Sequence, residues 1–365
     1  MRAAILEAVG APLHVTDEVV IEAPRAGEVR VTVTHCGLCH SDLSIIDGTF
    51  PAALPIVLGH EAAGVVAELG PGVDHLAVGD HVVLTPCPPC GLCYWCVRGQ
   101  PALCVNASGI QTNTFRDGTT GLSCGGVPVF RGLGVGAFAE SVVTPTTGAV
   151  RIPADVPLDV ACVIGCAVQT GVGAVLNTAR VEEGATVLVM GLGAVGLAVV
   201  QGARLAGAAR VIVSDPIAAR RAAAQRFGAT DLIDPTRDDV LAACHELTGV
   251  GVDYAFEAAG RASLIQLGLA ATRPGGTTVC LGAPRMEEAI EIAPAVLFVV
   301  TEKKLLGCLL GSSNSLREIP RLVALWQAGR LDLDGLVTAR RPLIEINEAV
   351  VDLRAGRGIR TVLAI

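Results

Sequence analysis

Residues 185–196 read ATVLVMGLGAVG, and this stretch decides the fold of the second half of the chain. The run ATVLVM is continuously apolar, which is typical of a buried parallel strand. It leads directly into Gly191, Gly193 and Gly196 and then into a helical stretch, LAVVQGARLAG. A second strand, RVIVSD, follows and ends at Asp215. A strand, a glycine loop, a helix and an acid that closes the next strand together predict a dinucleotide-binding fold.

Each glycine of this loop has a physical reason to be there. Gly191 permits a tight turn, Gly193 lets the backbone approach a pyrophosphate, and Gly196 allows close packing of helix on strand. Phosphates favour the start of the helix, at Ala194 and Val195, because unpaired N–H groups and the helix dipole attract anions there. We therefore expect all five residues to contact the coenzyme.

Asp215 indicates which coenzyme is bound. Its carboxylate would accept hydrogen bonds from the adenosine ribose hydroxyls and would repel a 2′-phosphate, and the residue that follows is Pro216 rather than an arginine. This pattern favours NAD over NADP. Arg220 is close enough in sequence to contact the adenosine side, although it could equally belong to a solvated helix face.

Strands and helices continue to alternate beyond Asp215, which predicts a doubly wound parallel sheet of the α/β class. The expected elements are helices at 217–227, 238–248 and 262–272 and strands at 231–234, 252–260, 277–282 and 303–311. The first 85 residues instead show short strands with period-two alternation and only a short helix near Ser41. We expect a β-rich domain over residues 1–167, a dinucleotide domain over 168–310, and a segment from 311 to 365 that folds back onto the first domain.

The composition restricts the partners of the chain. Its 365 residues are sufficient for two domains, and the net charge of −8 argues against nucleic acid or an anionic membrane as a partner. The apolar run at 187–200 is too short and too rich in glycine to span a membrane. Thirteen cysteines without a signal peptide favour metal binding over disulfides, and the expected compartment is the cytoplasm.

Residues 35–61, HCGLCHSDLSIIDGTFPAALPIVLGHE, contain candidate metal ligands. Cys39 precedes the pair His60–Glu61, and thiolate, imidazole and carboxylate groups all bind zinc. A catalytic zinc takes three protein ligands and keeps one position open. From these residues alone, two ordinary core residues are an equally good interpretation.

Residues 87–104, CPPCGLCYWCVRGQPALC, carry the strongest local signal. Cys90, Cys93 and Cys96 are spaced C-x2-C-x2-C, and Cys104 follows shortly after. Four thiolates complete a tetrahedral zinc, which makes such a site structural. The loop is rich in proline and glycine and has little to pack, so a metal would hold it where a core cannot. The alternatives are an iron–sulfur cluster or disulfides.

Taken together, these motifs resemble the zinc-dependent alcohol dehydrogenases of the medium-chain dehydrogenase/reductase family. The resemblance covers nearly the whole chain and rests on GLCHSD (37–42), GHE (59–61), the four-cysteine loop, GCAVQTG (165–171), GLGAVG (191–196) with Asp215, and IRTVL (359–363). It implies a GroES-like β-rich catalytic domain beside a Rossmann coenzyme domain, two zinc ions per chain, NAD, and a homodimer in which the 303–311 strand pairs across the interface.

The resemblance also implies roles for individual residues. Cys39, His60 and Cys166 would hold the catalytic zinc, with Glu61 behind the metal as an alternative ligand. Asp42 would orient His60, and Ser41 would hydrogen-bond the alcohol and begin its proton exit; a helix N-cap is the other interpretation of Ser41. The remaining implied roles are coenzyme contacts, at His40 and Arg360 with the pyrophosphate and at Thr170 beside the nicotinamide.

Two positions depart from the family pattern. Many members carry a histidine where this chain has Ser44, so proton release would pass through water or another base. Pro86 stands where a pocket aromatic is common, with Phe50 opposite, which favours aryl or longer-chain alcohols. The members that act on a glutathione adduct usually have an acidic residue at the position of Phe50, so its absence here argues against that substrate.

The function that these features predict is hydride transfer between NAD and a small-molecule alcohol or aldehyde, assisted by zinc. The alternatives are a thiol-adduct formaldehyde dehydrogenase, a nicotinoprotein that retains its NAD, and a non-catalytic zinc protein that keeps the fold.

Overall fold

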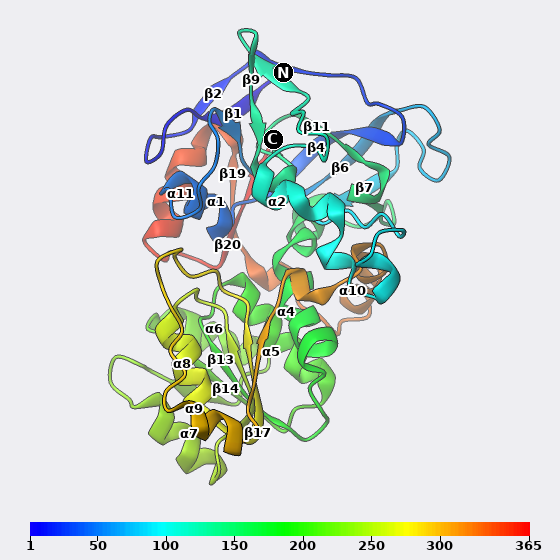
Figure 1. Ribbon diagram of the computed structural model, residues 1–365. Helices are drawn as coiled ribbons and strands as arrows, with labels where there is room; N and C mark the ends of the chain where they lie inside the picture. The colour runs from blue at the N-terminus through cyan, green and yellow to red at the C-terminus, as the bar shows by residue number, and fades with distance from the viewer. The chain divides into compact units, whose positions relative to one another are not determined.

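The computed structural model describes residues 1–365 and divides them into two compact units. We call Met1–Gln169 with Ser313–Ile365 the terminal unit, and Thr170–Ser312 the central unit (Figure 1). Each break falls slightly later in the chain than the expected boundaries at 167 and 310.

The central unit is built on a six-stranded parallel sheet in the order β15-β14-β13-β16-β17-β18. The strands are β13 (Thr186–Met190), β14 (Arg210–Ser214), β15 (Asp231–Ile233), β16 (Val252–Glu257), β17 (Thr272–Cys280) and β18 (Lys304–Gly307). This order is that of a doubly wound dinucleotide-binding sheet, and it confirms the predicted fold class.

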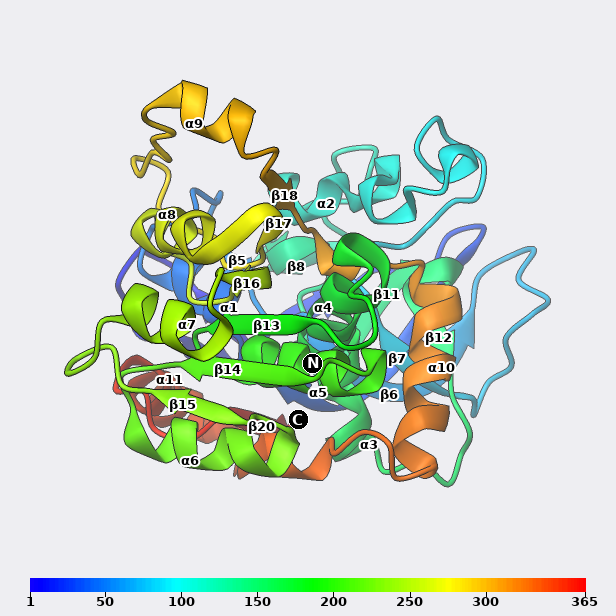
Figure 2. The ribbon, with the colours of Figure 1, turned by 90° about the horizontal axis from the view of Figure 1, so that it is seen from below.

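Four helices connect these strands and cover the sheet. They are α5 (Ala194–Ala206), α6 (Ala218–Phe227), α7 (Val240–Thr248) and α8 (Ala262–Ala271). Helices α5 and α6 pack together, as do α7 and α8 (Figure 2). The strand order reverses after β15, and right-handed crossovers therefore place the two pairs on opposite faces of the sheet. The ligand crevice of such a sheet lies at the carboxyl ends of its strands, where β13 meets Gly191.

Some elements of the central unit differ from the sequence prediction. Strand β17 begins at Thr272 rather than at residue 277, because Thr272 pairs with Val252 before a shift in register. Pro274 and Gly275 within it are strand-breaking residue types, which hid its first half. Helix α9 (Ala295–Val300) was not predicted at all.

The terminal unit consists mainly of antiparallel sheet. Its largest sheet has the order β12-β7-β6-β4-β20-β19, with β11 pairing β4, and smaller sheets have the orders β10-β5-β1-β2 and β3-β8-β9. The strands are β1 (Ala3–Leu6), β2 (His14–Thr16), β3 (Val19–Ile21), β4 (Glu28–Gly37), β5 (Ile56–Val57), β6 (Glu61–Leu69), β7 (His81–Leu84), β8 (Leu122–Cys124), β9 (Val127–Pro128), β10 (Phe130–Arg131), β11 (Ser141–Pro145), β12 (Ala149–Arg151), β19 (Val337–Pro342) and β20 (Arg360–Ala364).

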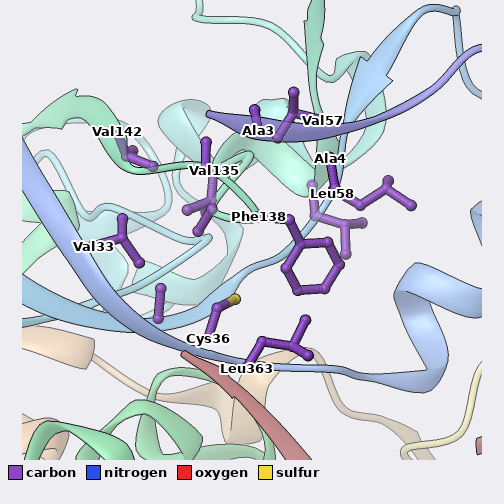
Figure 3. Close-up of a cluster of buried hydrophobic side chains, with 14 of the residues drawn as sticks. Ala3, Ala4, Val33, Cys36, Val57, Leu58, Val135, Phe138, Val142 and Leu363 are labelled. Carbon is purple, nitrogen blue, oxygen red and sulfur yellow. The ribbon is translucent and has the colours of Figure 1, made fainter. Parts of the chain in front are cut away.

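Strand β4 forms because its apolar side chains recur at every second position. Val29, Val31 and Val33 are at most 3% exposed, whereas Thr32 between them is exposed. The buried side chains contribute to a core that also includes Phe138 and Leu363 (Figure 3).

The end of the chain completes this sheet. Strand β20 runs antiparallel to β4, with Leu363 opposite Cys36, and parallel to β19. Helices α10 (Ser315–Gln327) and α11 (Ile346–Arg354) belong to the same returning segment. The C-terminal segment is therefore an integral part of the terminal unit.

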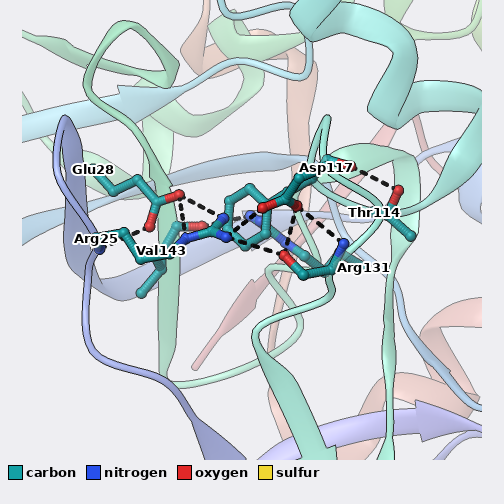
Figure 4. Close-up of polar contacts among 8 residues, drawn as sticks. Arg25, Glu28, Thr114, Asp117, Arg131 and Val143 are labelled. Carbon is teal, nitrogen blue, oxygen red and sulfur yellow. Dashed lines mark hydrogen bonds and ion pairs between the residues drawn. The ribbon is translucent and has the colours of Figure 1, made fainter.

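A loop between α2 (Gly109–Thr112) and β8 is held by two arginines, Arg25 and Arg131, that both contact the ring of Phe115. Arg25 also donates to Glu28 at 2.8 Å and to Asp117 at 2.6 Å (Figure 4). Arg131 is buried, its guanidinium lies 3.7 Å from the ring centroid, and burial lowers its pKa to about 9. Cation–π contacts and ion pairs thus order a segment that has little regular structure.

No single helix of the chain is long and apolar enough to cross a membrane. One bent pair, Leu158–Gly165 with Ala167–Ala179, passes that test by length and composition alone.

Candidate metal and coenzyme sites

The four sulfurs of Cys90, Cys93, Cys96 and Cys104 lie within 4.8 Å of one another. The sulfurs of Cys93 and Cys104 are 3.8 Å apart, which matches the edge of a tetrahedron with Zn–S bonds of about 2.3 Å. Backbone N–H groups donate to the sulfurs, as from Cys93 to Cys90 at 3.3 Å. The donor set therefore fits a tetrahedral zinc.

Backbone N–H groups lower the pKa of Cys90 and Cys93 in this loop, whereas burial raises the pKa of Cys96 and Cys104. The N–H of Cys96 and then that of Val105 lower the pKa of Cys93 to about 6. Cys87 has different surroundings, because burial raises the pKa of its thiol to about 12. It lies outside the four-sulfur group.

A second group brings together Cys39, His60, Glu61 and Cys166, whose ligand atoms also lie within 4.8 Å of one another. Cys39 stands between β4 and α1 (His40–Ile46), and His60 immediately precedes β6. Cys166 lies between the 3-10 helix Cys162–Gly165 and α4 (Ala167–Gly173). The fold thus joins residues that are far apart in the sequence.

Asp42 holds the backbone and the imidazole of this group through hydrogen bonds. Its side chain is fully buried and accepts hydrogen bonds from Cys39 N at 3.0 Å and Gly59 N at 2.9 Å. It also lies 3.2 Å from His60 Nδ1. The opposite ring nitrogen, His60 Nε2, is buried without a hydrogen-bond partner. A buried imidazole nitrogen that is turned toward two thiols and lacks a partner fits a zinc ligand.

The turn that presents His60 depends on the glycine before it. Gly59 has φ +90°, in the left-handed region, and an added Cβ would lie 2.7 Å from Phe138 N. Any side chain at this position would therefore displace the His60 backbone from the site.

Glu61 and Arg360 form a buried pair beside the same group. Their side chains are 0% and 4% exposed, and Arg360 Nε lies 3.2 Å from Glu61 Oε2. Neither atom has a well-directed hydrogen bond, so the contact is an ion pair without hydrogen-bond alignment. Burial raises the pKa of Glu61 to about 7, while Arg360 opposes the shift. Arg360 also donates to the carbonyl of Leu38.

The remaining residues predicted for this site lie on α1 or at the start of the central unit. Cys39 is the N-cap of α1, so Ser41 lies inside the first turn and the N-cap interpretation of Ser41 is wrong. The Ser41 hydroxyl is 3.8 Å from Cys39 Sγ. His40 is exposed, and Thr170 is a buried residue that opens the central unit.

The glycine loop of the central unit has the geometry of a phosphate cradle. Gly191 has φ +91°, and an added Cβ on Gly196 would lie 1.8 Å from Gly191 O. A Cβ on Gly193 would meet no atom within 4 Å, so the loop leaves open space there. Gly193 is the N-cap of α5, whose first turn contains Ala194 and Val195. This cradle fits a pyrophosphate.

Asp215 lies at the end of β14, beside this loop. Its carboxylate accepts from Leu192 N at 2.7 Å and from Ile217 N at 2.8 Å. Arg220 lies on α6, but it is Arg221 that donates to the Asp215 carbonyl, at 2.6 Å. Arg221 was not singled out from the sequence, because two adjacent arginines on one helix carry no signal that separates them.

Two family models match successive parts of the chain. The model described as "Alcohol dehydrogenase GroES-like domain" matches residues 25–154, and the one described as "Zinc-binding dehydrogenase" matches residues 194–325. Among curated proteins, the chain is similar to an S-(hydroxymethyl)glutathione dehydrogenase from Synechocystis sp., at 37% identity over 99% of each chain.

Solved structures agree with this assignment. The structure of an alcohol dehydrogenase zinc-binding domain protein from Burkholderia ambifaria is 37% identical, with a TM-score of 0.94 over 100% of this chain and 98% of that one. Benzyl alcohol dehydrogenase from Acinetobacter calcoaceticus is 33% identical, with a TM-score of 0.94 over 100% and 99%. The chain therefore belongs to the zinc-dependent alcohol dehydrogenases of the medium-chain dehydrogenase/reductase family, oxidoreductases that use zinc and NAD.

Proposed function

We propose that this enzyme interconverts alcohols and the corresponding aldehydes or ketones at a zinc held by Cys39, His60 and Cys166. The observation that supports this most directly is the buried donor set in which His60 Nε2 has no partner of its own. A bound zinc supplies a Lewis acid that lowers the pKa of the alcohol hydroxyl, and NAD accepts or returns the hydride.

The side chains around the donor set orient the ligands, offer a further ligand or transfer the proton of the alcohol. Asp42 holds His60 through Nδ1, so that Nε2 faces the metal position. Glu61 stands behind as an alternative ligand, and the Ser41 hydroxyl accepts the proton of the alcohol and passes it on. Because Ser44, and not a histidine, lies three residues further along α1, that proton continues to water rather than to an imidazole.

We assign the pyrophosphate to Gly191, Gly193 and Gly196 with the first turn of α5, and to His40 and Arg360. The ribose of adenosine is assigned to Asp215 and the adenosine side to Arg220, with Thr170 beside the nicotinamide. The carboxylate of Asp215 supports NAD rather than NADP, because it would repel a 2′-phosphate.

Zinc counting on purified variants tests the two metal sites separately. We expect two zinc ions per chain, one fewer in Cys39→Ser with loss of alcohol oxidation, and one fewer in Cys90→Ser with loss of thermal stability. Cys162→Ser is the matched control, because Cys162 is buried, as Cys39 is, but lies outside both groups. An unchanged zinc content in Cys39→Ser would contradict the proposed catalytic site.

For the substrate, we propose a primary alcohol that is aryl or long-chain. Pro86 stands where a pocket aromatic is common in the family, and one solved relative is a benzyl alcohol dehydrogenase. A panel of alcohols followed by NADH absorbance tests this, with benzyl alcohol expected to exceed ethanol in kcat/KM.

A thiol-adduct formaldehyde dehydrogenase is the second candidate, because one relative carries that activity in its name. S-hydroxymethylglutathione in the same panel separates the two candidates. If its kcat/KM exceeds that of every simple alcohol, the first candidate is wrong. NAD that remains bound after desalting would identify a nicotinoprotein.

We further propose a homodimer in the cytoplasm. Helix α9 exposes Val296, Leu297, Val299 and Val300, each at least 55% exposed, and β18 is an edge strand of the central sheet. Exposed apolar side chains beside an unpaired strand edge are typical of an interface between copies. The thirteen free cysteines support a reducing compartment.

A further inference from the structure

Gln169, Ser315 and Thr85 are three polar side chains in the interior of the terminal unit that the proposed chemistry does not use. They are 0%, 1% and 2% exposed; Gln169 lies on α4, Ser315 begins α10, and Thr85 directly follows β7. Buried polar groups are costly unless they are hydrogen-bonded, so their arrangement carries information about what they hold in place.

The three side chains form one hydrogen-bonded row. Gln169 Nε2 donates to the carbonyl of Gly165, and Ser315 Oγ donates to Gln169 Oε1 at 3.0 Å. Thr85 Oγ1 lies 2.9 Å from Ser315 Oγ and accepts from Cys87 N at 3.3 Å.

The direction of this row follows from its ends. The Gly165 carbonyl can only accept, so the amide of Gln169 turns its NH2 toward it and its oxygen toward Ser315. Ser315 has one proton and donates it to that oxygen, so it must accept from Thr85, whose own oxygen accepts from Cys87 N. Each contact of the row thus joins one donor to one acceptor, and only one orientation of the Gln169 amide satisfies both the Gly165 carbonyl and the Ser315 hydroxyl.

The row ends at the carbonyl of Gly165, which belongs to the peptide bond between Gly165 and Cys166. The Gly165–Cys166 peptide is held through the Gly165 carbonyl, and the Cys166–Ala167 peptide is held by Ala167 N, which donates to Glu61 Oε1 at 3.2 Å. These two planes define φ and ψ of Cys166, which are −137° and −72°, outside the regular helix and strand regions. Such a conformation persists only when its surroundings impose it.

We infer that Gln169 is a positioning residue for Cys166, and that Ser315 and Thr85 fix the amide that does the positioning. The inference rests on the proposed zinc site, in which Cys166 is a ligand. Gly165 adds to the constraint, because an added Cβ there would lie 2.5 Å from Leu84 O, so this peptide cannot move toward β7. On the Gly165 side, the direction of the Cys166 sulfur is thereby set by residues that are not ligands of the metal.

The test measures the release of zinc from the holoenzyme to excess chelator. Gln169→Leu removes both the donor and the acceptor of the amide. We expect it to speed zinc release from the catalytic site by roughly 10–100-fold, because loss of a residue that orients a metal ligand usually weakens metal binding by that factor. Ser315→Ala should act in the same direction with a smaller effect, and Ser315→Thr, which keeps the hydroxyl, should restore slow release. Cobalt in place of the catalytic zinc should show altered visible bands in Gln169→Leu.

Thr272→Val is the matched control. Thr272 is also buried, and its hydroxyl donates to Leu269 O at 3.0 Å in the central unit. It should lower the melting temperature without changing zinc release. If Gln169→Leu and Ser315→Ala lower the melting temperature but release zinc at the wild-type rate, the row is merely structural and the inference is overturned. If Gln169→Leu does not fold, Ser315→Ala alone decides the question.

These outcomes are distinct from a failure of the proposed function. That failure appears as an equal zinc content in wild type and Cys39→Ser, whatever the release rates are.

Discussion

Single residues in the zinc group depend on neighbours that hold them. Asp42 receives three polar contacts and leaves one nitrogen of His60 turned toward the thiols. Gly59 keeps the His60 backbone in a turn that no side chain would permit. The chemistry that we propose is therefore sensitive to residues that do not contact the alcohol.

Ser44 is the residue at which we expect the pH dependence to differ from that of relatives with a histidine. It is half-buried on α1, and its carbonyl accepts from Phe50 N at 2.9 Å. In Ser44→His, an imidazole with a pKa of about 6.5 can take the proton from the alcohol. The rate of alcohol oxidation should then rise at neutral pH and follow that pKa.

The measurement is the pH–rate profile of wild type and variant with one alcohol. Ser44→Asn is the control, because it adds a side chain that does not titrate. A profile that is identical in Ser44→His and wild type would show that proton release does not pass this position.

Glu257 predicts a pH dependence of stability in the central unit. Its side chain is fully buried, one oxygen accepts from the N–H groups of Ala259 and Gly260 at 2.8 and 2.7 Å, and the other has no partner. Burial raises its pKa above 4.5, although these N–H groups oppose the shift. The folded state thus binds the proton more tightly than the unfolded chain does, and stability falls as pH rises above 4.5.

Glu257→Gln removes this dependence and keeps one oxygen as acceptor. The melting temperature of the variant should equal that of the wild type at about pH 4.5 and exceed it at about pH 7.5. Thermal melts of both proteins at the two pH values give the comparison. A variant that is less stable mainly at the higher pH would mean that the carboxylate form is the favoured one.

At the scale of secondary structure, α9 and β18 are the elements whose exposed surfaces support a dimer. Leu297→Glu would place a charge in the apolar surface of α9, and in a symmetric interface each substitution counts twice. We expect sedimentation to show monomers in place of dimers. Val250→Glu, at an equally exposed valine between α7 and β16, should leave the dimer intact. Dimers that persist in Leu297→Glu would place the interface elsewhere.

The sequence predicts those elements best whose signal is local. The glycine loop and the four-cysteine loop are defined by spacing alone, because each forms within one short segment. Cys166 could be joined to Cys39 only through a family resemblance, since their proximity depends on the packing of separate elements. Gln169 and Glu257 gave no signal, because a single polar residue in an apolar run does not reveal what it bonds. Helix α9 was missed because its residues form a uniformly apolar run without helical periodicity.

At the scale of the whole molecule, the two units should differ in their response to loss of the chain end. Val362 and Leu363 are fully buried in the terminal unit, so deletion of residues 360–365 removes roughly 3–6 kcal/mol of side-chain burial. Calorimetry should show the transition of the terminal unit lost or lowered while that of the central unit remains. Deletion of Ile365 alone, which is half-buried, should have a much smaller effect. A single transition that shifts as a whole would show that the units unfold together.

The pairing of Cys36 with Leu363 also has a consequence for biosynthesis. A ribosome adds about 5–20 residues per second, so β4 waits tens of seconds for the partner that completes its sheet. The central unit, by contrast, has its whole sequence before β20 has been translated. During that interval the cysteines of the nascent terminal unit have emerged without their finished surroundings. We therefore expect an oxidant that is present during synthesis to lower the yield of folded enzyme more than the same oxidant added after synthesis.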